Sequence, residues 1–400
     1  MKVKKINVID FIIIAYILCA IITDEGSSIM QIARLILMGT FGATLIKKHR
    51  IKINLYVWWL IIFWIFSTCS TFWADDSNIA ASMSKTLFIN MLCMYALMYL
   101  VDFNKKKLDV ALKTCIVAPF LLEIRVIATG GLFAFSNTRI AGGVSGNTIG
   151  LCAAFGTCMA AYFIIQKEKK NLYLIFFLID FIIVILSSSR KALLCVFIPL
   201  LFVYILNHKD NIVKNLYKVI IACVVIVLGY VAIIKVPILY ETVGHRIQSM
   251  IAMLLGDTSA ADASSLTRFK LISWGMEWFK QHPWIGHGID NYRVVLHAYH
   301  SDYPTSYYAH NNYVELLVDV GVIGLILYYW NYIFIFLKGI KYRKKIMNTE
   351  ILFLGMLLAL LINEYGLVSY YDKYIQILFL LIWIVIDLLK RRQNKFQGVD

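Results

Sequence analysis

Apolar residues form long runs from one end of the chain to the other. Each run has about 15–24 residues, close to the roughly 20 that a helix needs to cross a bilayer. Mostly short polar segments separate the runs. We predict twelve membrane spans, at residues 8–23, 28–46, 55–72, 86–101, 108–128, 147–166, 171–188, 191–206, 217–234, 314–337, 350–369 and 374–389.

One polar segment, residues 235–313, is much longer than the others and should carry structure of its own. Within it, residues 265–281 predict an amphipathic helix that ends before His282-Pro283. Its predicted apolar face comprises Phe269, Ile272, Met276 and Phe279, beside an aromatic stripe of Trp274 and Trp278. We expect this helix to lie along the membrane surface.

The composition agrees with an all-α polytopic membrane protein. Hydrophobic residues make up 60% of the chain and charged residues only 16%, whereas soluble proteins have about 45–50% and 25%. So few polar residues cannot cover the surface of soluble domains. The expected organisation is nine spans in residues 1–234, the large loop at 235–313, and three spans with a tail in 314–400.

The net charge of +15 follows the positive-inside rule. Polar segments on the side of the N-terminus hold 25 Lys and Arg, against five in the short loops of the other side and six in the long loop. We therefore expect a multi-pass protein of the bacterial cell (inner) membrane, with both termini cytoplasmic and residues 235–313 outside. Orientation explains the basic charge, so no nucleic-acid partner is expected.

One short outer turn breaks the charge rule. Arg190 and Lys191 follow Ser187-Ser188-Ser189 between the seventh and eighth spans. Cations on this side of a membrane often line a cavity or a substrate path. The alternative is that both side chains snorkel to anionic lipid headgroups.

The long loop is rich in histidine, the side chain that exchanges protons near neutral pH. It holds six of the eight histidines: His245, His282, His287, His297, His300 and His310. Its aromatic residues suit the apolar faces of sugars and equally suit anchoring at the membrane interface. These features favour a site at the outer membrane surface.

Four segments, in this order, resemble motifs of the O-antigen ligase and polysaccharide polymerase family (Wzy/WaaL-type membrane glycosyltransferases). They are Arg139-Ile140-Ala141-Gly142-Gly143 leading to Gly146-Asn147; Ser187-Ser188-Ser189-Arg190; Arg268-Phe269-Lys270-Leu271 leading through Trp274 to His282-Pro283-Trp284-Ile285-Gly286-His287-Gly288; and His310-Asn311-Asn312-Tyr313-Val314-Glu315-Leu316 with Gly321 and Gly324. The chain departs from the family at Lys191, where a small residue is usual, and at His287, inside a Gly-x-Gly turn.

The resemblance implies a GT-C-like fold and metal-independent glycosyl transfer, without a cofactor, from a polyprenyl-diphosphate-linked glycan to an acceptor hydroxyl. The implied partners are the lipid-linked donor, the acceptor and the lipid bilayer, and a chain-length regulator is a further candidate. Within the family, a polymerase of repeat units for capsule, exopolysaccharide or O-antigen competes with a ligase. Lys outnumbers Arg 28 to 11, as in AT-rich bacteria, many of which lack lipid A; this favours the polymerase.

The predicted catalytic residues are His310, Arg190 and Arg268. A leaving diphosphate needs fixed cations, and arginine binds phosphate bidentately. His310 would be the general base for the acceptor hydroxyl. The alternatives are an interfacial residue for His310 and a solvent-facing residue for Arg268. The predicted substrate-binding residues are Arg139, Arg293, Asn311, Trp274 and His287.

Two carboxylates lie within predicted spans. Asp180 falls in the seventh span and Glu364 in the eleventh. We expect both to be structural, paired with Arg34, Arg125 or a tyrosine. In a transporter or lipid flippase, the alternative from another functional class, they would instead be ion-coupling groups.

Overall fold

The computed structural model describes residues 7–101, 104–130, 140–141, 143–187, 189–206, 263–304, 306–341 and 348–397, together with isolated positions between 217 and 248. This part of the chain is helical apart from one pair of two-residue strands, β1 (Ile140–Ala141) and β2 (Val144–Ser145), which are antiparallel. The helices are α1 (Val8–Ile22), α2 (Ser28–Lys48), α3 (Leu55–Cys69) with η1 (Ser70–Phe72), α4 (Ser77–Val101), α5 (Lys105–Gly130), α7 (Gly146–Ile165), α8 (Lys170–Leu186), α9 (Arg190–Leu206), α13 (Ala263–Phe279), α14 (Tyr292–Tyr299), α15 (Asn312–Lys341), α16 (Asn348–Asn363) with η4 (Glu364–Gly366), and α17 (Lys373–Gln397).

Eleven of the twelve predicted spans coincide with helices, and the ninth, 217–234, lies outside the described residues apart from isolated positions. Among the described residues, six helices are long and apolar enough to cross a membrane. They are Ser28–Lys48, Leu55–Phe72, Ser77–Val101, Gly146–Ile165, Asn312–Lys341 and Thr349–Gly366. The chain is therefore an α-helical membrane protein, but the predicted count of twelve is not confirmed. Several of the remaining helices, such as α8 and α9 with 17 residues each, lie at the short end of the spanning range.

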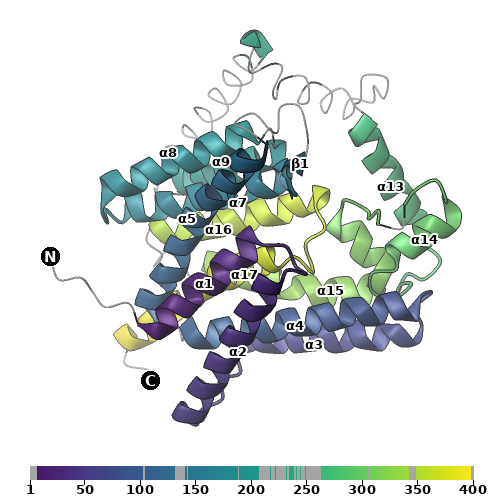
Figure 1. Ribbon diagram of the computed structural model, residues 1–400, viewed down its shortest axis with the longest axis horizontal. Coiled ribbons are helices and arrows are strands. Elements are labelled where there is room, and N and C mark those ends of the chain that lie inside the picture. The colour runs from purple at the N-terminus through teal and green to yellow at the C-terminus, as the bar shows by residue number, and fades with distance from the viewer. Residues whose placement is uncertain are drawn as a thin grey trace.

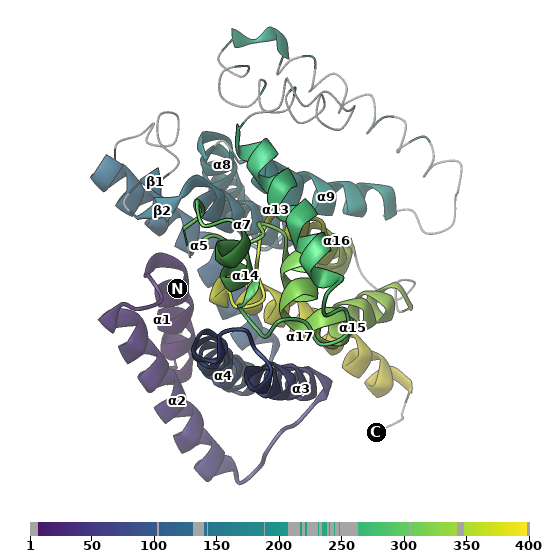
Figure 2. The same cartoon turned by 90° about the vertical axis from the view of Figure 1, so that its right-hand side faces the viewer.

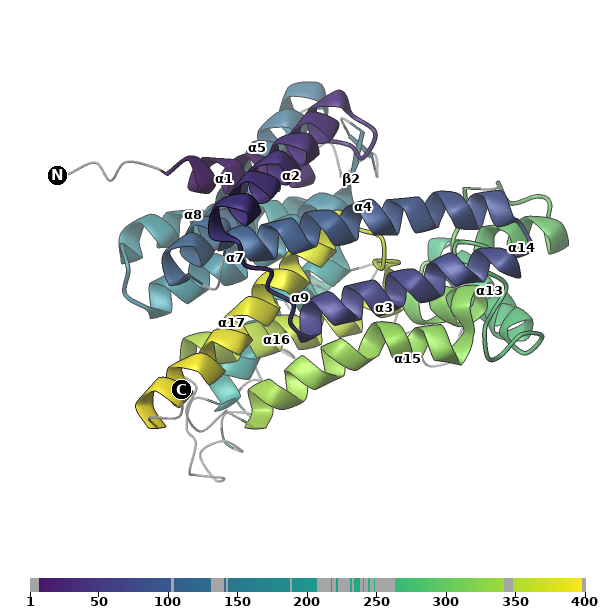
Figure 3. The same ribbon diagram turned by 90° about the horizontal axis from the view of Figure 1, so that it is seen from below.

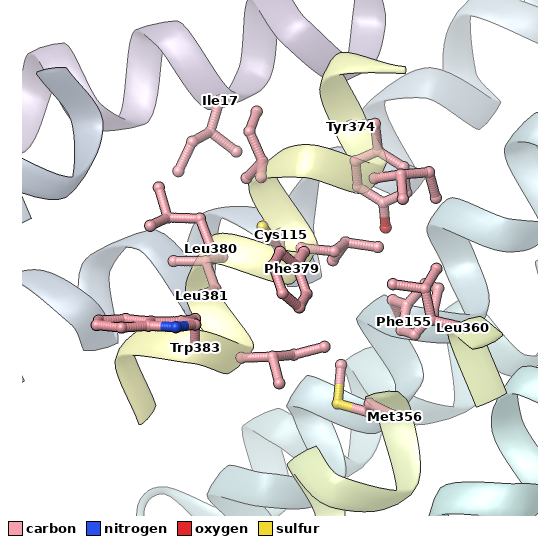
Figure 4. Packing of buried hydrophobic residues seen from close by; sticks show 14 of the residues in the cluster. Ile17, Cys115, Phe155, Met356, Leu360, Tyr374, Phe379, Leu380, Leu381 and Trp383 are labelled. Atoms are coloured by element: carbon pink, nitrogen blue, oxygen red, sulfur yellow. The ribbon is translucent and has the colours of Figure 1, made fainter. Parts of the chain in front are cut away.

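The centre of the bundle is α17, whose residues 375–386 are buried on every side, as expected of a helix enclosed by others (Figure 4). The Phe379 ring stacks on Tyr332 of α15 with centroids 3.9 Å apart, and Tyr374 donates a hydrogen bond to the Cys152 carbonyl of α7. Helix α7 itself is rich in small residues, which let neighbouring helices approach closely. At Gly150, an added Cβ would lie only 2.3 Å from Ser187 Oγ.

The outer helices present large apolar side chains away from the bundle. On α2, Leu35 is 72% exposed and Ile29 59%, and on α8 Ile175 is 55% exposed. A soluble protein rarely leaves such faces uncovered, whereas lipid tails match them. These surfaces agree with a membrane location.

Connections between helices gather in two groups at opposite ends of the bundle (Figure 3). At one end, Lys373 Nζ at the start of α17 is 3.2 Å from Glu25 Oε2 in the α1–α2 turn, and Ser70 Oγ accepts a hydrogen bond from Ile289 N. At the other, Lys338 Nζ lies 2.6 Å from Asp387 and Tyr99 Oη donates to the Arg50 carbonyl. The orientation that the charge pattern predicts stays a prediction.

The described part of the long loop forms α13 and α14 at the end of the molecule away from both termini (Figures 1 and 2). The predicted apolar face of α13 is confirmed in part: Ile272, Met276 and Phe279 pack against the buried Leu271 and Trp278, whereas Phe269 is 56% exposed. The buried face is centred on Leu271 and Trp278 because α13 packs on α15. Gly275 permits this approach, since a Cβ there would lie 2.5 Å from Val314 Cγ1.

Candidate active site

His310 lies in the last turn before α15 and has a left-handed backbone with φ of 54°. Non-glycine residues rarely adopt this conformation, and such strain is concentrated at functional sites. The next residue, Asn311, is buried, and its Oδ1 accepts hydrogen bonds from Tyr313 N and Val314 N, at 3.0 and 3.1 Å. Asn311 thus caps the N-terminus of α15 and fixes the position of the half-buried His310 side chain.

The surroundings of the His310 imidazole are apolar and cationic. Its ring centroid lies 4.1 Å from that of Tyr308. Burial, followed by the charges of Arg268 and Lys191, lowers the pKa of His310 from 6.5 to about 4. The imidazole is therefore neutral at neutral pH and able to accept a proton. Arg268 comes from α13 and Lys191 from α9, so charges from two distant segments act on His310.

The first turn of α9 carries Arg190 and Lys191. Ser189 caps this turn, its Oγ accepting a hydrogen bond from Ala192 N. Cations near a helix N-terminus oppose the helix dipole at a cost of roughly 0.3–1 kcal/mol each, while an anion is favoured there. Ser189 Oγ also donates to Asn147 Oδ1 at 3.0 Å, which joins the first and second sequence motifs.

The third and fourth motifs pair through their backbones where α15 breaks at Gly321. His287 N and Gly288 N donate to the carbonyls of Val318 and Asp319, each at 2.8 Å. Beyond the break, Val322 N and Ile323 N donate to the carbonyls of Pro283 and Trp284. The loop therefore replaces helical hydrogen bonds that α15 loses, and so holds the region around His310 in place.

Asp319 and His287 complete this junction. Asp319 accepts hydrogen bonds from Asp290 N at 2.8 Å and Tyr292 N at 2.7 Å. The His287 ring is buried, with Nδ1 2.8 Å from Asp75 Oδ2 and Nε2 3.2 Å from the Trp278 carbonyl. Both ring nitrogens therefore contact groups of the protein itself. These contacts give His287 a place in loop docking, and its predicted substrate binding stays a prediction.

Arg293 and Trp274 contact other residues of the loop. Arg293 of α14 is paired with Asp290, and burial raises the pKa of that carboxyl to about 6 against the opposing effect of Arg293. Trp274 stacks on His300 with centroids 3.7 Å apart. Both contacts give these residues a place in loop packing, and their predicted substrate binding stays a prediction. Arg139 lies outside the described residues.

A network that the motifs do not include lies beneath His310. Glu364 is fully buried and accepts hydrogen bonds from Tyr329 Oη at 2.6 Å and Ser369 Oγ at 2.5 Å. Asn312, next to the cap, donates to Tyr329 Oη at 2.8 Å. Glu364 thus has the tyrosine partner expected of a structural carboxylate. Asp180 is equally buried, but neither oxygen has a hydrogen-bond partner in the described part of the chain, so its expected pairing is not observed.

A cavity of about 330 Å³ lies on the same side of the bundle as this network. It is lined by the α1–α2 turn, β2, the start of α7 and residues 371–374. Among the lining charges, Glu25 is paired with Lys373. Burial raises the pKa of the lining Tyr371, and the charge of Glu315 acts in the same direction.

The sequence was compared with known proteins. The family model described as O-antigen ligase (Wzy_C) matches residues 175–329. No curated protein matches the chain in sequence. The matched segment includes Arg190, Lys191, Arg268 and His310, and it ends within α15. This match confirms the resemblance: residues 175–329 of the chain are similar to the O-antigen ligase domain of the O-antigen ligase and polysaccharide polymerase family.

Proposed function

We propose that this protein polymerises polyprenyl-diphosphate-linked oligosaccharide repeats at the outer surface of the bacterial cell membrane. The observation that carries the proposal is the convergence of α9, α13 and the start of α15 on His310. A base and cations placed together are the groups that this transfer requires. The product would be a capsule, an exopolysaccharide or an O-antigen.

In the proposed reaction, His310 accepts the proton of the acceptor hydroxyl as its oxygen bonds to the anomeric carbon of the donor. The bond from this carbon to the diphosphate oxygen breaks, and the electron pair leaves with the polyprenyl diphosphate. Arg190 and Arg268 stabilise the charge that develops on the leaving group. Fixed cations supply this charge, so we expect the reaction to need no metal ion.

Donor binding would also prepare the base. The pKa of His310 is low because of burial and the cations Arg268 and Lys191. A bound diphosphate would offset both positive charges and raise the pKa of His310 toward its ordinary value. The imidazole would then be a stronger base only when the donor is present.

The experiment is polymerisation in nanodiscs with purified lipid-linked repeat, in the presence of EDTA. Wild-type protein should extend chains. His310→Ala should lower the rate about 10²–10⁴-fold, the usual effect of removing a general base. His297→Ala is the matched control, because His297 is exposed in the same loop and should remain active. Wild-type chain lengths from His310→Ala would contradict the assignment, and complete loss in EDTA would contradict the metal-free reaction.

A ligase is the second candidate, favoured by the description of the matching family model. The two activities predict different products in a deletion strain. Single lipid-linked repeats alone would support the polymerase. Intact polymer that stays on its lipid carrier would support the ligase.

A further inference from the structure

Lys191 occupies the position at which the chain departs from its family motif, and the motif gives it no role. In the structure it lies in the first turn of α9, half-buried, beside the C-terminal end of α16. Asn363 Nδ2 donates to the Lys191 carbonyl at 3.3 Å. The Lys191 side chain runs along Gly366, where an added Cβ would lie 2.8 Å from Lys191 Cε and 3.1 Å from Nζ.

This placement separates Lys191 from a lipid-facing lysine. A snorkelling side chain would extend toward the headgroups, away from the helix packing. The Lys191 side chain instead passes over η4, and its charge acts on His310 together with that of Arg268. The backbone of Gly366 has no positive φ, so the missing side chain, not an unusual conformation, is the feature that matters there.

We propose that Lys191 is a substrate-binding residue, a third cation that binds the diphosphate of the lipid-linked donor, and that Gly366 leaves the space that its ammonium group needs. This inference rests on the proposed function. Arginines bind phosphate through a planar fork, whereas the compact lysine ammonium acts as a point charge. A diphosphate has two phosphates to engage, and a lysine in the first turn of α9 adds a contact that the arginines do not replace.

Four variants test the proposal: Lys191→Met, Lys191→Arg, Gly366→Ala and the double variant Lys191→Met/Gly366→Ala. Lys85→Met is the matched control, because Lys85 is an exposed lysine on α4 and is expected on the same side of the membrane. The probes are undecaprenyl diphosphate and undecaprenyl monophosphate, added as inhibitors of the reaction in nanodiscs. Thermal unfolding in the same nanodiscs reports whether each variant is folded.

Lys191→Met should weaken inhibition by undecaprenyl diphosphate about 10- to 100-fold, the range for the loss of one charged hydrogen bond. The monophosphate should lose less, and Lys191→Arg should recover part of the effect. Gly366→Ala should weaken diphosphate inhibition because the methyl group displaces the ammonium. It should have little further effect in the Lys191→Met background, since there is no ammonium left to displace.

Diphosphate inhibition of Lys191→Met equal to that of Lys85→Met would overturn the proposal while leaving the polymerase reaction intact. Additive losses in the double variant would overturn the role of Gly366. If the wild-type protein neither polymerises nor transfers glycan, the proposed function fails. Direct binding of undecaprenyl diphosphate to the same variants then decides the role of Lys191: equal affinities for Lys191→Met and Lys85→Met reject it, and a selective loss supports it.

Discussion

At the scale of single residues, the chemistry of the site depends on the kind of cation as well as on its charge. Arg190 follows the serine that caps α9, and Ser189 is itself tied to Asn147. This places a guanidinium at the N-terminus of a helix, which favours anions. A planar fork can then bind two phosphate oxygens at once.

Arg190→Lys should therefore lower polymer formation strongly although the charge is kept, because the ammonium cannot form the bidentate contact. Arg190→Ala should lower it further, with the protein level unchanged. The measurement is chain length and rate in nanodiscs, with membrane-inserted protein quantified by immunoblot. Normal product from Arg190→Ala would mean that the residue only anchors α9 at the lipid surface.

The protonation of His310 gives a second prediction at this scale. Arg268 and Lys191 face it from α13 and α9, and Tyr307 and Tyr308 from its own segment. Because its pKa is lowered to about 4, the neutral form persists as the pH falls from 7 to 5 and is lost below about 4. Only neutral imidazole reacts with diethyl pyrocarbonate, so modification of His310, read by mass spectrometry, should halve near pH 4.

The contribution of the cations can be checked in the same experiment. Lys191→Met removes one of the two charges that lower the pKa, so its midpoint should move to higher pH. A midpoint near 6.5 in the wild-type protein would show that neither burial nor the cations act on His310 in the membrane.

At the residue scale, the sequence indicates the chemistry of single side chains but not the contacts that they make. Arg268 and His310 were predicted from separate motifs, and the structure brings them together. The contacts of His287 with Asp75 and the Trp278 carbonyl could not be predicted from its motif. The same is true of Lys191, whose neighbours Asn363 and Gly366 are more than 100 residues away in the sequence. The contacts that a residue makes with distant segments cannot be predicted from its own motif.

At the scale of elements, the break in α15 connects the loop to the membrane bundle. The apolar run 314–337 predicts one continuous helix, because periodicity reports which faces are apolar and not whether the backbone hydrogen bonds continue. Gly321 has φ of 64° and ψ of −169°, a region open essentially to glycine alone. The hydrogen bonds that compensate the break come from residues 283–288, so no local pattern could have predicted it.

Gly321→Ala should detach this junction. A Cβ there would lie 2.3 Å from the Trp284 carbonyl carbon, and the backbone strain alone is about 1–3 kcal/mol. We expect a lower unfolding temperature, faster proteolysis of the loop and loss of activity. Gly39→Ala on α2 is the control, since a Cβ there meets nothing within 4 Å. Equal proteolysis of the two variants would mean that the break does not hold the loop.

At the scale of the whole molecule, the described turns between helices lie in two groups, one at each end of the bundle (Figure 3). The end that carries α13, α14 and His310 lies opposite the termini (Figures 1 and 3). Its short turns are poor in Lys and Arg, whereas the opposite end holds most of the basic residues. The packing and the charge bias are independent observations, and together they favour a site that faces outward.

Cysteine labelling tests this orientation. In a protein whose eight cysteines are replaced, we introduce one cysteine at Ser301, exposed in the long loop, or at Lys167, between α7 and α8. A membrane-impermeant maleimide added to intact cells should label Ser301→Cys, because the loop is expected outside, and should leave Lys167→Cys unlabelled until the membrane is permeabilised. Replacement of Lys167 removes one inner cation among 25, too few to reverse the bias. The reverse pattern of labelling would place His310 in the cytoplasm, away from any lipid-linked donor presented at the outer surface, and the proposed polymerase reaction would have to be abandoned.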